Sequence, residues 1–131
     1  MASVKTMTMS AEFEAIADLE RNLARTRFAG DFTVTTMQAA AAKVETLLAG
    51  LKPGFSILAD FSRLNNMDLE CVPHLTRIMD LCRAHKIGFI VRILPEKKHD
   101  IGINMLAVVH YHGEVKTATV TTLAEAERLL S

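Results

Sequence analysis

Two short apolar runs, joined by an amphipathic stretch, dominate the hydrophobic pattern of this chain. The runs cover residues 55–61 and 87–94, and each has the length and continuous apolar character of a strand buried on both faces. Between them, apolar side chains recur at helical spacing at Val72, Leu75, Ile78, Met79 and Cys82. The pattern predicts a βαβ unit in which Ile57 and Ile90 lie on parallel, neighbouring strands. Sites in parallel sheets gather beyond the carboxyl ends of the strands, so residues 60–68 and 95–100 should share one rim.

The segment that precedes this unit admits two interpretations. Its apolar residues could line one face of a helix, which the composition favours; they are Phe13, Ile16, Ala17, Leu19 and Leu23. Alternatively, residues 13–17 and 23–28 form a β-hairpin, since Arg25 and Arg27 alternate with smaller or apolar residues and the turn contains Asp and Asn. We prefer the hairpin. Residues 1–10 are polar and threonine-rich, and are either a frayed tail or an edge strand.

Capping residues predict where the first two helices begin. Thr35 and Gln38 have the spacing of a capping box, and the helix after them is ended by Gly50 and the Pro-Gly pair that follows. Its apolar stripe comprises Met37, Ala40, Ala41, Val44, Leu47, Leu48 and Leu51. In the helix of the βαβ unit, Pro73 must lie in the first turns, so Asp68 is the expected N-cap.

The last third of the chain is predicted to contain a helix, a strand and a second helix. Residues 101–109 form a short apolar segment with Asp100 as its candidate cap, and residues 115–122 alternate as a strand with one solvated face does. Thr122 and Glu125 then form another capping box before a terminal helix. All elements together predict an α/β fold with a mixed sheet of about four to five strands, flanked by about four helices.

Length and charge narrow the classes of function. The chain has 131 residues, enough for a single domain over residues 1–131. Its fifteen basic and fifteen acidic side chains cancel, so neither nucleic acid nor a membrane surface is expected as a partner. Cys71 and Cys82 would lie about 16 Å apart along one helix, too far for a disulfide, so both are expected as thiols. No leader or membrane-spanning segment is evident, and a cytoplasmic location is expected.

The joint between the first strand and helix of the βαβ unit resembles that of STAS domains, the anti-sigma factor antagonist family. In that family a buried strand ends in Asp-Leu-Ser, and a hydrophobic residue and Asp stand directly before the second helix. Here Asp60, Phe61 and Ser62 match the first motif, and Met67 and Asp68 match the second at the same spacing. The resemblance extends over the element order from about Phe13 to Leu130, including the early hairpin, and implies a STAS-like fold.

The resemblance also raises the question of phosphorylation. In phosphorylatable members the Asp is followed by Ser-Ser or Ser-Thr, and a partner anti-sigma kinase phosphorylates the second hydroxyl. In this chain Asp68 is followed by Leu69 and Glu70, so no hydroxyl stands at the acceptor position. Glu70 either supplies a permanent negative charge there or simply stabilises the start of the helix. Switching by a kinase at this position is therefore not expected.

These residues predict a non-enzymatic regulatory domain that acts through protein–protein interaction in bacterial signalling, with an anti-sigma factor-like regulator as a candidate partner. The expected contact surface comprises Ser62, Asn65, Asn66, Asp68, Leu69 and Glu70. Leu69 lies off the core stripe and is the candidate apolar anchor. A homodimer is an alternative partner arrangement.

A second hypothesis is a binding module for a small anion, nucleotide or lipid. The amides of Ile101 and Gly102, together with Lys97, Lys98 and His99, could hold a phosphate or carboxylate, although a solvated loop is the simpler explanation of the run and is favoured. No nucleotide-binding motif is present and no cofactor is expected.

An enzyme is the least favoured reading of the sequence. His110 and His112 could begin a metal site only if they lie on a strand, and no third ligand has useful local spacing, so no metal is expected. Cys71 near a helix start would have a lowered thiol pKa if exposed, but its place on the apolar stripe favours a buried, inert group.

Overall fold

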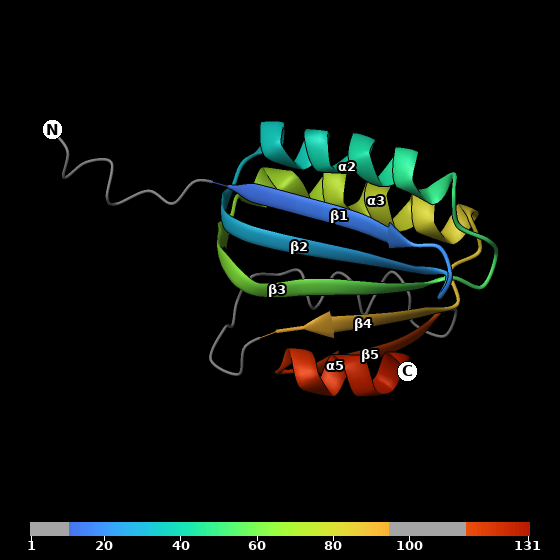
Figure 1. Cartoon of the computed structure of the whole chain (residues 1–131). Coiled ribbons are helices and arrows are strands. Elements are labelled where there is room, and N and C mark those ends of the chain that lie inside the picture. Colours follow the sequence, from blue (N-terminus) through green and yellow to red (C-terminus); the bar gives the residue numbers. More distant parts are fainter. Residues whose placement is uncertain (1–10, 95–114) are drawn as a thin grey trace, which may run out of the picture.

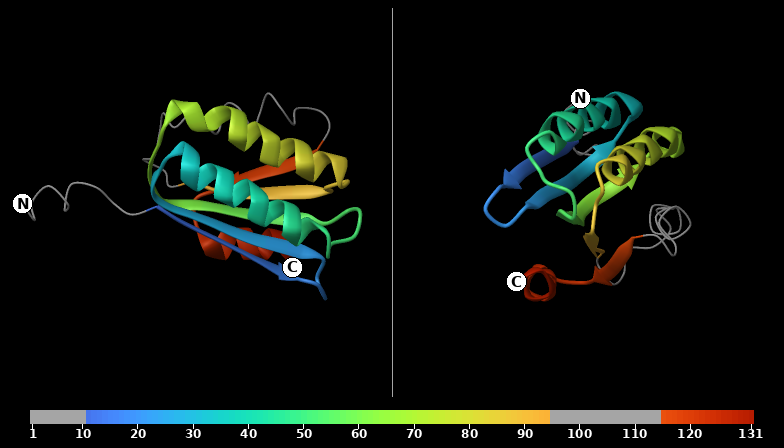
Figure 2. Two further views of the ribbon diagram at one scale, coloured as in Figure 1. Left: turned by 90° about the horizontal axis from the view of Figure 1, so that it is seen from above. Right: turned by 90° about the vertical axis from the view of Figure 1, so that its right-hand side faces the viewer.

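The computed structural model describes residues 11–94 and 115–131. Within them, five strands form one sheet in the order β1-β2-β3-β4-β5; β1 and β2 are antiparallel and the other neighbours are parallel. The strands are β1 (Glu12–Asp18), β2 (Leu23–Phe32), β3 (Ser56–Met67), β4 (Phe89–Ile93) and β5 (Lys116–Val120), and the helices are α2 (Val34–Leu48), α3 (Val72–Ala84) and α5 (Leu123–Leu130). Helices α2 and α3 cover one face of the sheet, and α5 covers part of the other (Figures 1 and 2). The predicted α/β class and mixed sheet are confirmed; the segment 101–109, expected as a further helix, lies outside the described residues.

The early hairpin is confirmed and the helical alternative is wrong. Strands β1 and β2 pair from Glu12 with Ala29 to Asp18 with Leu23, and the chain reverses at Asn22, whose φ is +52°. The amide side chain of Asn22 accepts a hydrogen bond from Lys52 N at 2.8 Å and donates one to Lys52 O at 3.1 Å. This residue adopts the left-handed conformation more readily than most, so the turn suits it.

The βαβ unit is confirmed, with Ile57 beside Ile90 in parallel register. Strand β3, however, does not end near Asp60 as predicted but continues to Met67 beside β2. The pairing of β2 with β3 shifts register twice, between Arg27 and Ala29 and between Gly30 and Asp31. These irregularities break the two-residue alternation of β3, which explains why its polar second half resembles a loop in the sequence.

Three of the predicted helix starts fall within the described residues, and two of these are corrected. Helix α2 is capped by Thr33, whose hydroxyl accepts from Thr36 N at 3.5 Å, and the predicted box of Thr35 and Gln38 does not provide the cap. Asp68 precedes a one-turn 3₁₀ helix, η1 (Leu69–Cys71), and its side chain makes no capping hydrogen bond. Pro73 does lie in the first turn of α3, as predicted.

The third start, that of α5, is confirmed. Thr122 Oγ1 accepts from Glu125 N at 3.2 Å. The Glu125 carboxylate accepts from the Thr122 hydroxyl at 3.2 Å and from Thr121 N at 3.2 Å. The reciprocal bond thus reaches the amide one residue before the cap, and the box still satisfies two donors at the helix start.

The core has two parts, one on each face of the sheet. Between the sheet and helices α2 and α3, Phe28 stacks on Phe61 with ring centroids 4.7 Å apart and contacts Phe13 edge-on at 4.9 Å. Under α5 lies a smaller cluster of Leu23, Leu58, Val91, Ile93 and Ala126. Cys71 and Cys82 are buried free thiols, as predicted. None of the described helices combines the length and apolar character needed to cross a bilayer.

The amino ends of β3 and β4 approach each other closely at two glycines. Gly54 N donates to Lys86 O at 2.7 Å, and Gly88 N donates to Phe55 O at 2.7 Å. A Cβ atom at position 88 would lie 2.8 Å from the Gly54 carbonyl oxygen. Gly54 itself has φ of +88°. The parallel pairing of β3 with β4 therefore starts from a contact that only a glycine at position 88 permits.

Candidate functional site

The predicted contact surface lies mostly on one continuous segment at the carboxyl end of β3. Asn65 and Asn66 are the last exposed residues of the strand, and Asp68, Leu69 and Glu70 follow directly in the exposed turn before α3. Asn65 Nδ2 donates to Asp31 Oδ1 at 2.6 Å, so the strand end is tied to β2. The structure thus brings five of the six predicted residues together on a short stretch of chain.

Ser62 lies apart from that segment. It belongs to the middle of β3, where its backbone N donates to Asp60 Oδ1 at 2.8 Å. Asp60 is paired with Ile93, the last residue of β4, so β3 continues well beyond the end of its neighbour. At about 3.3 Å per strand residue, Ser62 is roughly 20 Å before Asp68. The carboxyl ends of β3 and β4 therefore do not lie at the same height. Asp60 and Ser62 lie near the end of β4, and residues 65–70 lie farther along, beyond it.

Leu69 is the most prominent side chain of this segment. Its exposed fraction is 83%, the highest among the large apolar side chains described as exposed. Two acidic residues flank it, and together with Pro73 they line a shallow, open hollow. A leucine this exposed has no role in the core of the chain, and its burial in a partner would stabilise a complex by about 1.5–3 kcal/mol.

The turn that presents Leu69 is fixed to the end of β2. Asp68 N donates to Phe32 O at 3.1 Å, and Cys71 N donates to Asp68 O at 2.9 Å. The Cys71 thiol also lies 3.7 Å from Phe32 O, as a weak donor. Cys71 is fully buried, whereas Leu69 two residues before it is exposed. The exposed leucine is thus held by a backbone that is anchored at both ends.

The electrostatic character of the segment is acidic. Burial raises the pKa of the Cys71 thiol, and the neighbouring Asp68 and Glu70 raise it further. The direction is opposite to the lowered thiol pKa that an exposed Cys71 near a helix start would have, and it keeps the thiol protonated at neutral pH. Over residues 11–94 and 115–131, no group of three or more His, Cys, Asp or Glu residues is placed to hold a metal ion.

The remaining predicted sites fall outside the described residues. They are the anion-binding candidates Lys97, Lys98, His99 and Gly102, and the histidine pair His110 and His112. The proposed anion site therefore stays a prediction, as does the interpretation of the two histidines.

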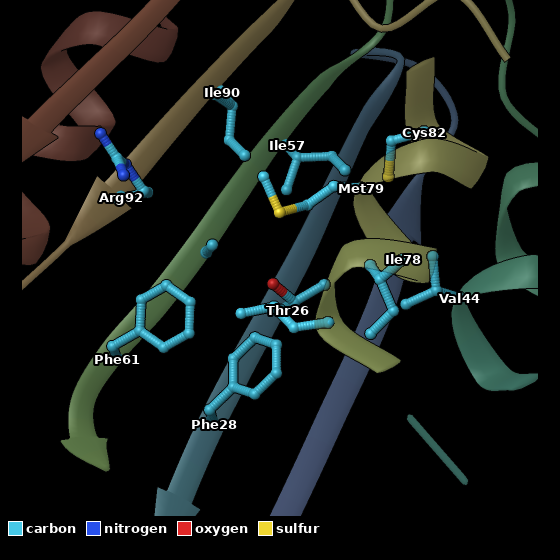
Figure 3. Close-up of a pocket in the computed structure, with 12 residues that line it drawn as sticks. Thr26, Phe28, Val44, Ile57, Phe61, Ile78, Met79, Cys82, Ile90 and Arg92 are labelled. Atoms are coloured by element: carbon cyan, nitrogen blue, oxygen red, sulfur yellow. The ribbon is translucent and has the colours of Figure 1, made fainter. Parts of the chain in front are cut away.

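A feature that the sequence interpretation missed is a hollow under α3, shown in Figure 3. It is lined by apolar side chains of the sheet and of α3, together with Thr26 and the buried Arg92. Within the described residues no atom accepts a hydrogen bond from the buried Nε of Arg92, although the residue has other interactions. The sequence does contain a sign of the buried arginine, because Arg92 is the only charged residue in the apolar run 87–94.

Comparison with solved structures finds several with the same arrangement of elements. An anti-sigma factor antagonist from Mycobacterium paratuberculosis matches with a TM-score of 0.56 over 91% of this chain and 94% of its own, at 10% identity. An uncharacterised protein with a SpoIIAA-like fold from Shewanella loihica gives 0.63 over 95% and 94%, at 14% identity. The phosphorylated form of SpoIIAA from Bacillus gives 0.54 over 92% and 99%, at 18% identity.

No family model matches the sequence, and no curated protein matches it either. The similarity is therefore one of fold, carried by nearly the whole length of both chains in each comparison. It agrees with the resemblance of Asp60–Ser62 and Met67–Asp68 to the STAS pattern. The chain has the SpoIIAA-like fold.

Proposed function

We propose that this protein is a non-enzymatic regulatory domain of bacterial signalling, which acts in the cytoplasm by binding another protein through the turn that presents Leu69. The observation that carries the proposal is a leucine with 83% of its surface exposed, between two carboxylates, on a turn fixed to β2. Two of the solved structures with this fold are described as anti-sigma factor antagonists, which supports an anti-sigma factor-like regulator as the partner.

The chemistry of the turn defines what the partner must offer. Leu69 requires an apolar pocket, where its burial excludes water, as in the central anchors of protein interfaces. Asp68 and Glu70 stand beside it and favour lysine or arginine at the rim of that pocket. Asn65 and Asn66 supply amide groups next to the turn. The expected interface is an apolar centre with a basic margin.

Glu70 bears on how the interaction is regulated. It occupies the position where phosphorylatable STAS domains carry the acceptor hydroxyl, so the phosphate switch is absent at this position. The carboxylate is exposed and therefore available to a partner. In this proposal, binding does not depend on phosphorylation at residue 70, and the partner contacts the charged carboxylate of Glu70 directly.

Site-specific crosslinking in the native cell tests this proposal. A photoreactive amino acid replaces Leu69 in one version and Leu129 in the other; Leu129 is a half-exposed leucine of α5, on the opposite side of the sheet. We expect a discrete crosslinked protein from position 69 and none of the same mass from position 129. The captured protein is then purified and its affinity for the unmodified domain is measured.

Matched substitutions complete the test. Leu69→Arg and Glu70→Lys should each weaken binding of the captured protein by tenfold or more, whereas Leu129→Arg should leave its Kd unchanged. Glu70→Gln separates charge from shape, and a smaller loss is expected there. If Leu69→Arg and Glu70→Lys bind as tightly as the original chain, the contact surface is not this turn.

A further inference from the structure

The carboxyl half of β3 has a single neighbouring strand among the described residues. Strand β4 pairs with β3 from Ser56 to Asp60 and ends at Ile93, whereas β3 runs on past the tip of β4 to Met67 (Figure 1). Along this continuation, β2 pairs with β3 on one side. On the other side, no strand within residues 11–94 and 115–131 is hydrogen-bonded to it. Such an edge presents backbone N–H and C=O groups to which another strand can pair.

Two hydrogen bonds mark where this edge begins and ends. Ser62 N donates to Asp60 Oδ1 at 2.8 Å, so this amide is already taken by a side chain. Asp68 N donates to Phe32 O at 3.1 Å, because the chain turns toward β2 there. Residues 63–67 lie between them and form the β3 edge, which is about 16 Å long at about 3.3 Å per residue. Successive residues of a strand direct their backbone groups to opposite sides, so about half of them face the open side.

The β3 edge is held in place by the rest of the fold. Leu64 and Met67 are buried in the main core, with 0% and 9% of their surfaces exposed. Asn65 Nδ2 donates to Asp31 Oδ1 at 2.6 Å, which ties the strand to β2 through side chains as well. A strand fixed in this way loses little conformational freedom when another strand pairs with it.

A bulge limits the kind of strand that the edge can accept. Asn65 is an extra residue, because the residues on either side of it, Leu64 and Asn66, pair with consecutive residues of β2. Bulges interrupt long regular pairing and are one means by which edge strands avoid joining a second sheet. The β3 edge therefore suits a short extended segment better than the regular edge strand of a second copy of this chain.

We propose that the partner protein adds a short extended segment as a strand to the β3 edge, with a lysine or arginine at the end beside Asp68 and Glu70. These two exposed carboxylates follow the edge directly and favour a basic side chain there. Backbone hydrogen bonds to the edge would supply affinity, and the turn that presents Leu69 would add specificity. The added strand rests on the function proposed above and specifies how the partner is bound.

Amide hydrogen exchange of the full chain, followed by NMR, tests whether the β3 edge is open. We expect alternate amides of residues 63–67 to exchange roughly tenfold or more faster than those of Leu58 and Ala59, which are paired with strands on both sides. Equal protection of the two groups would mean that another part of this chain already occupies the edge, and it would overturn the proposal.

Short peptides selected from a random phage-displayed library on the immobilised full chain serve as the binding probe. We expect selected peptides to carry lysine or arginine and to slow the exchange of the open amides of residues 63–67. N-methylation of alternate residues of the tightest peptide then separates backbone pairing from side-chain contact. One alternate set should weaken binding by roughly tenfold or more and the other should leave the Kd unchanged, because only every second residue of an added strand faces β3.

A matched pair of substitutions checks the orientation of the bound segment. Glu70→Lys should weaken peptide binding by roughly fivefold, because it reverses the charge beside the basic end of the segment. Glu45→Lys changes an exposed carboxylate of α2 in the same manner and should leave the Kd unchanged. Equal Kd values for the two variants would contradict the proposed position of the basic residue.

The remaining outcomes separate the added strand from the proposed function. Equal effects of the two N-methylated sets, or no selected peptide that protects residues 63–67, would overturn the added strand. A protein crosslinked from position 69 that leaves the exchange of these amides unchanged would keep the proposed function and refute the strand alone. Peptides that protect the edge in the absence of any crosslinked protein would support the edge as a binding site and refute the role of the Leu69 turn.

Discussion

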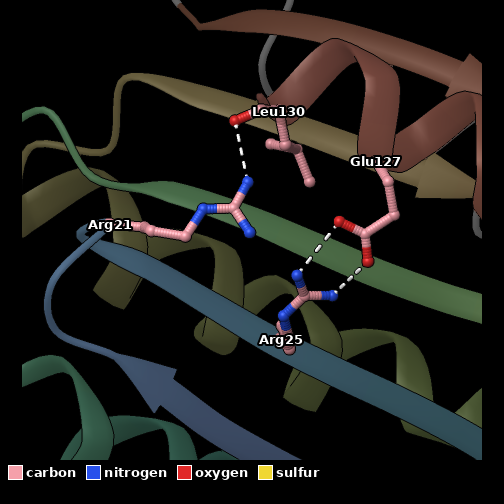
Figure 4. Close-up of polar contacts among 4 residues, drawn as sticks. All are labelled: Arg21, Arg25, Glu127 and Leu130. Carbon is pink, nitrogen blue, oxygen red and sulfur yellow. Dashed lines mark hydrogen bonds and ion pairs between the residues drawn. The ribbon is translucent and has the colours of Figure 1, made fainter.

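Arg25 of β2 and Glu127 of α5 form a salt bridge with two hydrogen bonds, from Nη1 to Oε2 at 2.6 Å and from Nη2 to Oε1 at 3.0 Å (Figure 4). Arg21 Nη2 adds a bond to Leu130 O at 3.2 Å. The mutual contact raises the pKa of Arg25 and lowers that of Glu127, in each case mainly through the side-chain hydrogen bond. These bonds attach α5 to β2. Among the strands that α5 covers, β2 is the one farthest from it in the sequence.

Removing the charge of Glu127 should loosen this attachment. Both side chains are about one third exposed, so solvent screening limits the expected loss for Glu127→Gln to about 0.5–1 kcal/mol of unfolding free energy. Urea denaturation measures it. Glu45→Gln is the control, because its single contact with Arg77 is 3.6 Å long and more than half exposed, and no measurable change is expected.

The same carboxylate should make stability depend on pH. The folded state lowers the pKa of Glu127 below its ordinary value of 4.5, so the unfolded chain binds the proton more tightly. The stabilisation is therefore complete above that value and is lost as the pH falls through the folded pKa. Glu125, held by the Thr121 hydroxyl, shifts in the same direction. The difference in stability between the original chain and Glu127→Gln should be present at neutral pH and shrink as the pH falls below 4.5; a constant difference would contradict this assignment.

The glycine contact between β3 and β4 predicts a sharp contrast between two substitutions. Gly88→Ala places a methyl group 2.8 Å from the Gly54 carbonyl oxygen and should cost about 2–3 kcal/mol, because backbone must move. Gly50→Ala meets the Leu19 side chain at 3.5 Å and the Leu47 carbonyl oxygen at 3.8 Å, which are ordinary van der Waals distances, and should be neutral or slightly stabilising. Thermal unfolding of both variants checks the prediction, and equal Tm values for the two variants would contradict it.

The two thiols should be unreactive in the folded protein. Burial raises the pKa of Cys82 to about 12, and the pKa of Cys71 is raised as well. Iodoacetamide at neutral pH should therefore modify neither residue in the native state, and both in urea, as read by mass spectrometry. Native labelling of Cys71 alone would show that the turn carrying Leu69 opens, contrary to its anchored geometry.

Local patterns in the sequence are sufficient to predict most of the fold. The pairing of Ile57 with Ile90 follows from two apolar runs and a helix between them, and the cap at Thr122 follows from one local motif. The extension of β3 to Met67 does not, because bulges in its pairing with β2 change which residues face the core. Asn65 and Asn66 therefore look like loop residues although they are in a strand.

The candidate site divides in the same manner. The position of Leu69 beside Asp68 is a local feature, and its exposure could be expected from its place off the apolar stripe. The hollow at Arg92 depends on residues from three strands and a helix, which no spacing along the chain reveals. The bond between Arg25 and Glu127 likewise joins residues that only the complete sheet brings together.

The order of strands in the sheet is the order of strands in the chain, and this has a consequence for synthesis. Each strand that leaves the ribosome can pair with the free edge of the strand made just before it. No strand has to insert later between two others. Helix α5 emerges after all five strands and covers Val91 and Ile93. A nascent chain that stops before α5 would expose those two side chains, which makes it a recognisable client for chaperones.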